Sequence, residues 1–594
     1  MPLRGPTHEM EILHEFNNKK IAREVDDAAF LLTNKRGGYI YFSNNIGSRY
    51  EGIYFNVNSS LYRVVADLNT GKKINRLINR LYCIERELKD NKETFFMPYF
   101  YNSLVYTQDK EEWVNLALDI RESYSLPVWG RFYEISEESD KLIIKYTHKN
   151  EEKNKKIFEG YVVLMAEPFR YKKIENWRKT YYERDRKRGT QPFELFIYSL
   201  AALKARKMVL TFSQDRESAI RECKHVFENS PKLEEKQRRH VEKLIGSRKI
   251  EKSDVGLAYT CCINSLDQLT TNKGIIAGLP WLFQYWTRDE LISLKNMKLS
   301  LRRRILLRDI GLLMGDGRLP NKLPNIGKNI DSVGWLFKRI SQNINHFSKI
   351  ELAIIEDKLV RSIKALEESY VRDAFLYNDA KETWMDTSFM DAGRIGARIE
   401  IQALLLEMYR LAHSLSGNEE FLRKERNLRK RVRDRFWNGE TLADGADDYT
   451  IRPNIFLSYY IYPKLLTKKE WITCFENSLK KLWLEWGGLS TIDKDSELFV
   501  GHNTGENPRS YHRGDSWYYL NNIAALTLYK VDKKKFRKYI KKILDASTKE
   551  ILWMGIAGAH SEISSANKQE ANGCESQAWS NSTYIELVNE LFST

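Results

Sequence analysis

The stretch TWMDTSFMDAGRIGARIEIQALLLEMYR (383–410) joins two features that recur through the second half of the chain. It begins as a loop rich in Trp, Asp and Gly. It continues with Ile399, Ala403 and Leu406 at intervals of three to four residues, the spacing of an amphipathic helix. Similar loops occupy 277–290 and 501–517, and similar helical spacing follows at 517–528 and 585–592. Loops of this length are usually functional or disordered, and their aromatic side chains argue against disorder. We therefore expect a helical domain whose polar-aromatic loops gather on one face.

The first part of the chain has the pattern of β-structure. KLIIKYTH (141–148) alternates in hydrophobicity and follows RFYEI (131–135) across a polar turn, which predicts a hairpin. YVVLMA (161–166), MVLTF (208–212) and LLTNKRGGYIYF (31–42) add further strands. A charged helical stretch, Ser218 to Lys249, follows. We expect three parts: a β domain over 1–215, a linker helix region over 216–250, and a helical domain over 251–594.

Composition sets the protein class. Of the 594 residues 42% are hydrophobic, enough for a substantial core and too many for a mainly disordered chain. No apolar run approaches the ~18 residues of a membrane span, and the N-terminus lacks the apolar block of a signal peptide. The six cysteines form no C-x-x-C pair, which indicates buried thiols in a reducing compartment. These features predict a cytoplasmic protein without a membrane partner.

The net charge of +16 allows two interpretations, a polyanion-binding protein or a protein with solvated basic helices. The excess lies in three tracts at 170–189, 301–308 and 423–436, all with helix-compatible spacing, and two of them include acidic residues. We favour solvated helix faces and expect no nucleic-acid partner.

The aromatic loops carry carboxylates, and this mixture suits sugars, whose C–H faces lie on aromatic rings while their hydroxyls bind polar groups. Hydrolysis of a glycoside needs two carboxyl groups on opposite sides of one bond. The residue pattern does not choose among the candidates, and Asp386 and Asp515 could instead be helix N-caps. The candidates are Asp331, Asp386, Asp391, Glu506, Asp515 and Glu562. There is no P-loop, H-E-x-x-H or G-x-S-x-G motif, and we expect no cofactor and no metal, His502 and His512 included.

Several segments in collinear order resemble a known family. The segments are AGLPWLFQYWTRDELISL (277–294), GRLPNKLPN (317–325), DSVGW (331–335), TWMD (383–386), RIGARIEIQALL (394–405), IRPNIF (451–456), GGLSTID (487–493), YHRGDSW (511–517) and GCESQAWSNST (573–583). They resemble landmarks of the glucosidase domain of glycogen-debranching enzymes, the amylo-α-1,6-glucosidases of glycoside hydrolase family 133. FLLTNKRGGYIYFSNNIGSRYEGIYF (30–55) resembles the opening of the prokaryotic enzymes. The helical half is also similar to glucoamylase-type barrels.

The resemblance implies an α+β multidomain protein, with an antiparallel β-sandwich followed by an (α/α)6 barrel. It implies an inverting mechanism in which Asp386 is the general acid and Glu562 the general base. It also implies a set of substrate-binding residues: Trp286, Arg288, Asp289, Asp331, Trp335, Trp384, Glu400, His512 and Trp517. Gln402 stands where the family usually has Asn, and the sequence around Asp515 lacks the family's Pro.

Three functions remain open at this point. The first is an exo-acting α-glucosidase that acts on α-1,6 branch points of glycogen-like glucans. The second keeps the chemistry but changes the bond, as in a glucoamylase, a trehalase or an oligosaccharide α-glucosidase. The third is a catalytically silent glucan- or nucleic-acid-binding protein. Linkage, substrate chain length and oligomeric state are left open.

Overall fold

The structure is a computed structural model that describes residues 10–16, 19–44, 46–150, 155–246, 254–324, 326–389 and 393–592. The chain divides into two compact units. The first comprises residues 1–251, 263–273 and 551–559, and the second comprises 252–262, 274–550 and 560–594.

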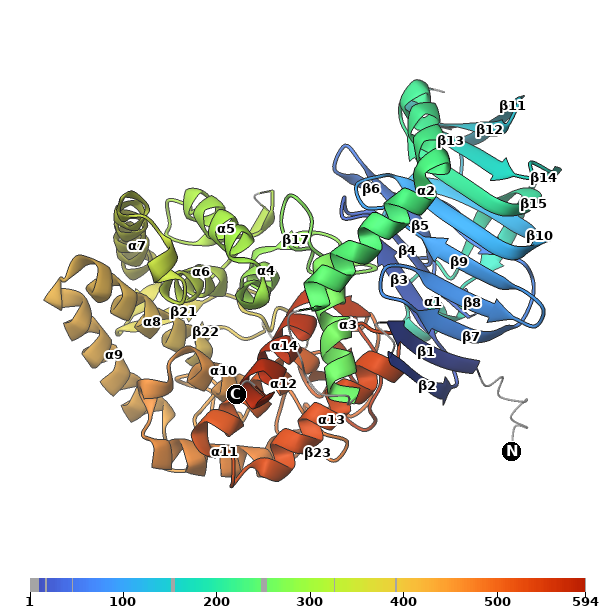
Figure 1. Cartoon of the computed structure of the whole chain (residues 1–594). Helices are drawn as coiled ribbons and strands as arrows, with labels where there is room; N and C mark the ends of the chain where they lie inside the picture. Colours follow the sequence, from blue (N-terminus) through green and yellow to red (C-terminus); the bar gives the residue numbers. More distant parts are fainter. Residues whose placement is uncertain are drawn as a thin grey trace. The chain divides into compact units, whose positions relative to one another are not determined.

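The first unit is built on a branched sheet of fifteen described strands (Figure 1). The strands are β1 (Met10–Phe16), β2 (Lys19–Val25), β3 (Ala29–Thr33), β4 (Tyr39–Ser43), β5 (Gly52–Val57), β6 (Ser60–Asn69), β7 (Ile74–Asn79), β8 (Ile84–Leu88), β9 (Lys92–Phe96), β10 (Ser103–Glu122), β11 (Arg131–Glu138), β12 (Lys141–Lys149), β13 (Lys156–Glu167), β14 (Tyr171–Tyr181) and β15 (Glu194–Ser213).

Two long strands divide this sheet into two layers. The first part of β10 pairs with β9 and its last part with β6, while β15 pairs with β14 at its start and with β13 at its end. Aromatic side chains join the layers: the rings of Phe30 on β3 and Phe95 on β9 lie 5.1 Å apart. The expected β-sandwich is present, and its pairing is antiparallel except where β1 runs parallel to β7.

Helix α2 (Arg216–Ile245) packs on this sheet and belongs to the first unit. Ala219, Cys223 and Val226 recur at helical spacing and join a buried apolar cluster with residues of β10, β12, β13 and β15. Asp215 caps the helix, because its carboxylate accepts a hydrogen bond from the backbone N–H of Ser218.

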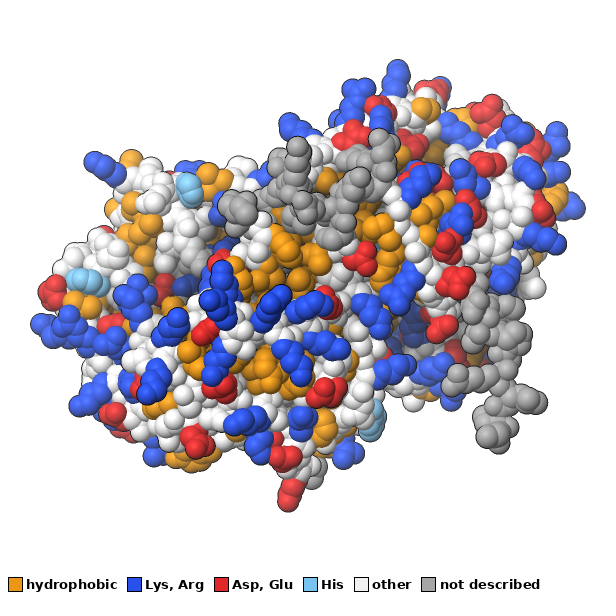
Figure 2. Space-filling view, turned by 60° about the horizontal axis from the view of Figure 1, so that its bottom comes forward, with side chains coloured by type: hydrophobic (Ala, Val, Ile, Leu, Met, Phe, Trp, Pro, Cys, Tyr) orange, Lys and Arg blue, Asp and Glu red, His pale blue; other side chains and the backbone are white. Residues whose placement is uncertain are grey.

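One basic tract has a different structure from the expected helix. Residues 171–181 of the tract 170–189 form strand β14, and only Glu183–Arg188 is helical, as α1. The prediction was wrong because Ile174, Trp177 and Tyr181 favour a strand and β15 offers a hydrogen-bonding partner. The other two tracts lie in helices, α5 (Leu299–Gly311) and α9 (Glu419–Phe436). Figure 2 shows Lys and Arg side chains spread over the visible face, with Asp and Glu among them.

The second unit is a barrel with a closed inner ring of six helices. Each inner helix packs against the next, and the last packs against the first. In order they are α4 (Thr287–Ser293), α6 (Asp331–Ser341), α8 (Ile399–Ser416), α10 (Asn454–Ile461), α12 (Tyr518–Asp532) and α14 (Ala578–Phe592). The helices α3 (Asp254–Gln268), α5, α7 (Lys349–Tyr370), α9, α11 (Lys468–Leu482) and α13 (Arg537–Trp553) alternate with them along the chain (Figure 1). This is the expected (α/α)6 arrangement.

Burial distinguishes the two sets of helices. Residues 518–528 of the inner helix α12 are all buried, whereas the outer helix α9 buries Phe421, Leu428 and Val432 on one face. Inner helices approach closely: a Cβ on Gly334 of α6 would lie 2.5 Å from the Cβ of Leu404 on α8. The inner helices are therefore buried on most of their surface, and the buried residues include polar ones such as Asn521 and Asn522 of α12.

Three further findings bear on the sequence analysis. Asp386 and Asp515 do not cap helices, because the N-caps of α8 and α12 are Arg398 and Trp517. The six cysteines are all buried, and no disulfide joins any of them within the described residues. Of the helices in the described ranges, none has the length and low charge needed to cross a bilayer.

Candidate active site

The candidate site lies where the inner helices of the barrel begin. Arg288, Asp331 and Glu400 occupy the first turns of α4, α6 and α8. The helices α4, α6, α8, α10 and α12 have no side-chain N-cap hydrogen bond, whereas Ser348, Asn418 and Thr467 cap the outer helices α7, α9 and α11. The electropositive ends of the inner helices thus remain available to carboxylates and to a bound ligand.

Arg288 is the centre of a group that we call the Arg288 cluster: Arg288, Asp289, Asp331 and Asp386. The Arg288 side chain is buried and donates from Nε to Asp331 Oδ2 at 2.7 Å. Its Nη1 lies 3.5 Å from Asp386 Oδ2. Its Nη2 is buried and has no hydrogen-bond partner among the described residues, and the same is true of Asp331 Oδ1. The cluster therefore has both donor and acceptor capacity to spare.

Burial and crowding raise the pKa of the carboxyl groups in this cluster. Burial raises the pKa of Asp289 to about 8; Arg288 opposes the shift, and the carboxylates of Glu562 and Asp386 add to it. Burial likewise raises the pKa of Asp331 to about 6, against the effect of Arg288. The pKa of Asp386 is also raised, chiefly by burial and again against Arg288. These carboxyl groups therefore hold protons at a higher pH than exposed carboxyls do.

Asp386 lies in the loop between β21 (Phe375–Asn378) and β22 (Gly396–Ala397). Its side chain is 32% exposed, whereas Arg288 beside it is almost fully covered. The preceding Trp384 is fixed, because its Nε1 donates to Asn454 Oδ1 at 2.7 Å. A carboxyl group that is enclosed by the protein but open on one side is suited to proton transfer.

Glu562 is 3% exposed and is held by two donors. Tyr511 Oη donates to its Oε1 at 2.6 Å, and the backbone N–H of Cys574 donates to its Oε2 at 2.8 Å. Gly573 makes room for it: a Cβ there would lie 2.4 Å from Glu562 Oε2, and its φ of +67° favours glycine. Contacts link Glu562 to the loop of Asp386 across 176 positions: Tyr511 donates to Glu562, and the next residue, His512, bonds through Nδ1 to the hydroxyl of Thr387, which follows Asp386, at 2.7 Å.

Aromatic rings surround these carboxylates. The ring of Trp384 meets His512, Trp517 and Tyr519 edge-on at 5.3–5.5 Å. The imidazole of His512 is stacked on Trp517, with ring centres 5.2 Å apart. Burial, followed by nearby arginines, holds the pKa of His512 well below its usual range, so its ring is neutral. Tyr519 stacks on Trp579 at 4.2 Å.

Further unpartnered polar atoms lie in this aromatic group and in the first turns near it. Among the described residues no hydrogen-bond partner exists for four buried atoms, which are His512 Nε2, Tyr519 Oη, Gln577 Oε1 and Trp579 Nε1. Buried polar atoms in proteins are usually paired, so a group of exceptions in one pocket indicates a place for a polar ligand.

Glu400 belongs to a different group, which we call the Asp444 cluster: Arg394, Arg398, Glu400 and Asp444. Arg394 donates two hydrogen bonds to Glu400, at 2.8 and 3.1 Å, and two more to Asp444, both at 2.8 Å. Arg398 and Asn454 also donate to Asp444. Each carboxylate oxygen of Glu400 and Asp444 accepts a hydrogen bond, so we assign this cluster a structural role at the site.

The remaining predicted residues lie apart from these contacts. The ring of Trp335 is near Arg339 and Tyr460, and Lys322 lies over the ring of Trp286. Asp515 accepts hydrogen bonds from Ser510 and Asn503 and braces the loop 501–517, in which Glu506 is exposed. Asp391 lies outside the described residues. Gln402 pairs with both backbone groups of Leu376 and is thus part of the scaffold.

Several residues of the site were not among those predicted from the sequence, namely Arg394, Asp444, Tyr511, Tyr519, Gln577 and Trp579. All but Asp444 and Tyr519 belong to the motifs quoted above, so membership of a motif was the available signal. Nothing in the local pattern distinguishes Asp444 from other acidic residues, because its role arises from three arginines that meet it in space.

Comparison with known proteins places the barrel in a family. Residues 259–586 match the family model described as amylo-alpha-1,6-glucosidase. A bacterial glucoamylase complexed with acarbose has a similar structure, with a TM-score of 0.56 at 12% identity over 94% of this chain and 87% of that chain. The GH63 mannosylglycerate hydrolase from Thermus thermophilus in complex with Tris gives 0.43 at 12% identity over 55% of this chain and 99% of that chain. None of the curated proteins matches the sequence. Because the family model spans more than half of the chain, this protein is a glycoside hydrolase that belongs to the amylo-alpha-1,6-glucosidase family.

Proposed function

We propose that the protein is an inverting, exo-acting α-glucosidase that removes glucose from α-1,6 branch points of glycogen-like glucans. One observation carries the proposal. Hydrogen bonds link Asp386 and Glu562 through neighbouring residues, because Thr387 bonds to His512 and Tyr511 donates to Glu562, yet the Asp386 side chain is 32% exposed and Glu562 is buried. Asp386 has a raised pKa, whereas two hydrogen-bond donors hold Glu562. Two carboxyl groups in unlike settings are what acid–base cleavage of a glycoside needs.

Asp386 is the general acid in this mechanism. As the bond between the anomeric carbon and the leaving oxygen breaks, Asp386 gives its proton to that oxygen. The raised pKa favours the protonated form of Asp386, which is the form that a general acid needs. Arg288 lies close enough to stabilise the carboxylate that remains.

Glu562 is the general base. It takes a proton from a water molecule on the opposite face of the sugar ring, and the water oxygen bonds to the anomeric carbon. Glu562 accepts from Tyr511 with one oxygen and from the Cys574 N–H with the other, and such donors favour the charged carboxylate that a base needs. Attack from this face converts an α-glucoside to β-glucose.

The Arg288 cluster and the aromatic group bind the terminal glucose. Arg288 Nη2 and Asp331 Oδ1 offer a donor and an acceptor to sugar hydroxyls, and Tyr519 Oη and Trp579 Nε1 lie on neighbouring helices of the ring. Trp384, His512 and Trp517 supply the rings that line this subsite. These polar atoms and rings would contact a single terminal glucose, which suits the end of a chain better than its middle and agrees with exo action.

The test is glucose release from a panel of substrates with α-1,6, α-1,4 and α,α-1,1 linkages. The proposal expects the highest kcat/KM on α-1,6 glucosyl stubs of a branched dextrin. Highest activity on maltose-type chains or on trehalose would reassign the linkage, to a glucoamylase or a trehalase, and keep the chemistry. Proton NMR of the first product separates the mechanisms, because α-glucose seen first would exclude inversion.

A further inference from the structure

A cavity of about 260 Å³ in the first unit belongs to none of the features described so far. Leu116 and Ala117 of β10 give it a buried apolar part, and Ile174 of β14 adds an exposed apolar side chain. The other lining residues are polar and come from four strands: Asp67 and Asn69 of β6, Asn115 of β10, Arg178 of β14 and Ser199 of β15.

Asp67 is the lining residue whose hydrogen bonding indicates a ligand in this cavity. The residue is 7% exposed, and its Oδ2 accepts from Arg178 Nη2 at 2.7 Å. Its other oxygen, Oδ1, is buried without a hydrogen-bond partner among the described residues. A buried carboxylate oxygen in a polar cavity without a donor is unusual in proteins. A hydroxyl or amide group of a ligand would supply that donor.

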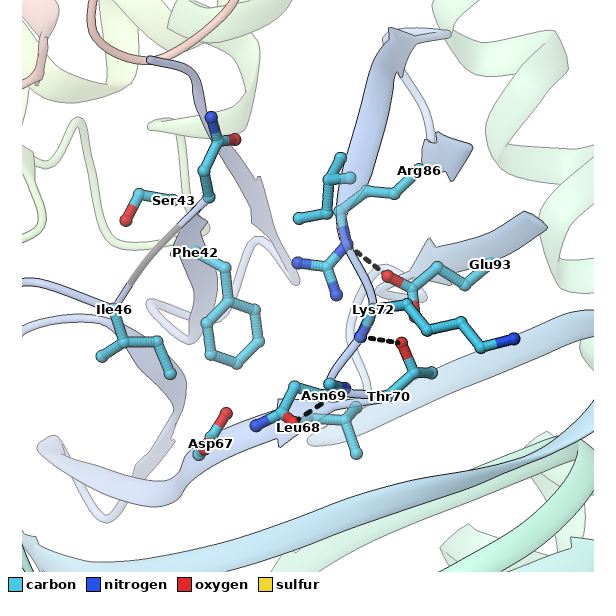
Figure 3. A pocket seen from close by; sticks show the side chains of 13 residues that line it. Phe42, Ser43, Ile46, Asp67, Leu68, Asn69, Thr70, Lys72, Arg86 and Glu93 are labelled. Atoms are coloured by element: carbon cyan, nitrogen blue, oxygen red, sulfur yellow. Dashed lines mark hydrogen bonds and ion pairs between the residues drawn. The ribbon is translucent and has the colours of Figure 1, made fainter. Parts of the chain in front are cut away.

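An adjoining cavity of about 300 Å³ shares Asp67 and Asn69 with the first. Figure 3 shows Asp67 and the ring of Phe42 pointing toward one another across it, with Arg86 and Glu93 on another side. Arg86 Nε donates to Glu93 at 2.5 Å. We call these two adjoining cavities, which share Asp67 and Asn69, the Asp67 groove.

Each of the three basic residues that line the Asp67 groove is paired with a carboxylate, and the partner of Lys72, Glu112, lies outside the lining. Arg178 is paired with Asp67 and donates from Nε to Ser199 Oγ at 3.1 Å, and Arg86 is paired with Glu93. A phosphate or a carboxylate would meet the unpartnered oxygen of Asp67, which repels anions. A neutral ligand with many hydroxyls meets no such repulsion. Its hydroxyls can donate to Asp67 and bond to the amide of Asn115, and its C–H face can lie on Ile174 or Phe42.

We propose that the Asp67 groove is a non-catalytic binding site for glucosyl units of an α-glucan chain. The choice of ligand rests on the proposed function, because an α-glucan is the neutral polyhydroxylated substrate of that reaction. Such a site would retain the enzyme on a polymer without contributing to the cleavage of any bond. It would lower the KM for glycogen and leave the KM for a short substrate unchanged.

Cyclodextrins separate this site from the active site, because a ring of glucose units has no chain end for an exo-acting pocket. The measurement is calorimetric titration of the full chain with β-cyclodextrin. Asn115→Trp fills the groove from an exposed position. Asn176→Trp is the matched control, since Asn176 is also exposed, lies on β14, which pairs with β15, and lines neither cavity. Asp67→Asn tests the carboxylate itself, with the melting temperature as a check on folding.

We expect Asn115→Trp to weaken cyclodextrin binding at least tenfold and to raise the KM for glycogen three- to tenfold, with kcat unchanged. Asn176→Trp should stay within twofold of the unsubstituted protein. Absence of cyclodextrin binding, or equal loss in both tryptophan variants, would overturn the proposal. So would tight, steeply salt-dependent binding of single-stranded DNA that Asn115→Trp abolishes, since the groove would then bind polyanions. Cyclodextrin binding by a protein that releases no glucose would refute the proposed function and leave the groove standing.

Discussion

The Asp444 cluster and the Arg288 cluster both consist of buried charged residues at the same end of the barrel. They differ in how many of their polar atoms are hydrogen-bonded. In the Asp444 cluster each carboxylate oxygen has a donor, and Arg394 alone makes four hydrogen bonds to Glu400 and Asp444. In the Arg288 cluster Arg288 Nη2 and Asp331 Oδ1 are buried without partners among the described residues. The carboxylates of the Asp444 cluster are thus fully hydrogen-bonded, with only Arg398 Nε left unpartnered among the described residues, whereas the Arg288 cluster has a free carboxylate oxygen as well as a free donor.

The difference appears in the pKa values of the two clusters. Three arginines hold the pKa of Asp444 well below its usual range although burial opposes them. In the Arg288 cluster burial exceeds the effect of a single arginine, and the pKa of Asp289 rises to about 8. We infer that the Asp444 cluster stabilises the fold, whereas the Arg288 cluster binds the hydroxyl groups of a substrate. The predictions below test this division.

The largest effect should come from the two proposed catalytic carboxyls. Asp386→Asn and Glu562→Gln should each lower kcat by about 10²- to 10⁴-fold, because each removes one proton-transfer group. Glucosyl fluoride, whose leaving group needs little protonation, should partly rescue Asp386→Asn but not Glu562→Gln. The melting temperature should change little in either variant. Normal turnover in Asp386→Asn would place the acid elsewhere, and Asp391 would be examined next.

A matched pair of substitutions tests the comparison itself. Asp444→Asn should reduce the free energy of unfolding by about 3–5 kcal/mol, because it leaves buried arginines without their counter-charge. Asp331→Asn should cost less than Asp444→Asn, because Asp331 is paired with one arginine rather than three and burial raises its pKa to about 6.

The same two substitutions should affect catalysis in the opposite order, with the more specific effect in Asp331→Asn. Asp331→Asn should raise the KM for small glucosides, and in Asp444→Asn activity should follow the fraction of folded protein. Chemical denaturation and steady-state kinetics measure both quantities. Equal destabilisation by the two substitutions would contradict the division into a structural and a substrate-binding cluster.

Much of this arrangement could be predicted from the sequence, for a physical reason. The inner helices are largely buried, so apolar residues such as Ile399, Ala403 and Leu406 recur at helical spacing, although some buried positions within them, such as Glu407, are polar. The β-sandwich was visible through alternating strands such as Lys141–Lys149. The tract 170–189 could not be assigned in this way, because strand β14 is exposed on both faces and shows no alternation.

The site could be predicted only where its residues are close in the sequence. Arg288 and Asp289 are adjacent, and Trp384 and Asp386 lie in one motif. The partners of these residues come from distant loops: Tyr511 reaches Glu562 across 51 positions, and Gln577 reaches Asp289 across 288. No local pattern specifies such pairs, because they depend on closure of the helical ring.

The pH dependence of stability provides a third test. The pKa of Asp289 is raised from 3.8 to about 8, so its contribution to stability is full below about pH 4 and is lost as the pH rises to 8. The free energy of unfolding should fall over this range by a few kcal/mol, at about 1.4 kcal/mol for each unit of pKa shift. Asp289→Asn keeps the oxygen that accepts from Gln577 and removes the titration.

Thermal melts at pH 5 and pH 8 measure this effect. The difference in melting temperature between the two pH values should be smaller in Asp289→Asn than in the unsubstituted protein. An undiminished difference would mean that another group is responsible, and Asp515, whose pKa burial raises to about 7, would be tested in the same way.

The smallest effect should follow from Tyr511→Phe, which removes one of the two donors to Glu562 and keeps the ring. A hydrogen bond to a charged group contributes about 1.5–3 kcal/mol. Since the Cys574 N–H remains, we expect a loss near the lower end, about tenfold in kcat, with KM nearly unchanged. The ring contacts of Tyr511 with His512 and Trp517, at 4.8 and 4.7 Å, should keep the loop in place.

The pH profile distinguishes this positioning role from a purely structural one. Loss of a donor disfavours the charged form of the base, so the acidic limb of kcat/KM should move to higher pH in Tyr511→Phe. A structural defect would lower activity at every pH by the same factor. Tyr519→Phe is the matched control, because Tyr519 is also a buried tyrosine of the site but its hydroxyl has no partner among the described residues. It should change KM and leave the acidic limb where it is. A shift of that limb in both variants would mean that Glu562 responds to the pocket as a whole rather than to Tyr511.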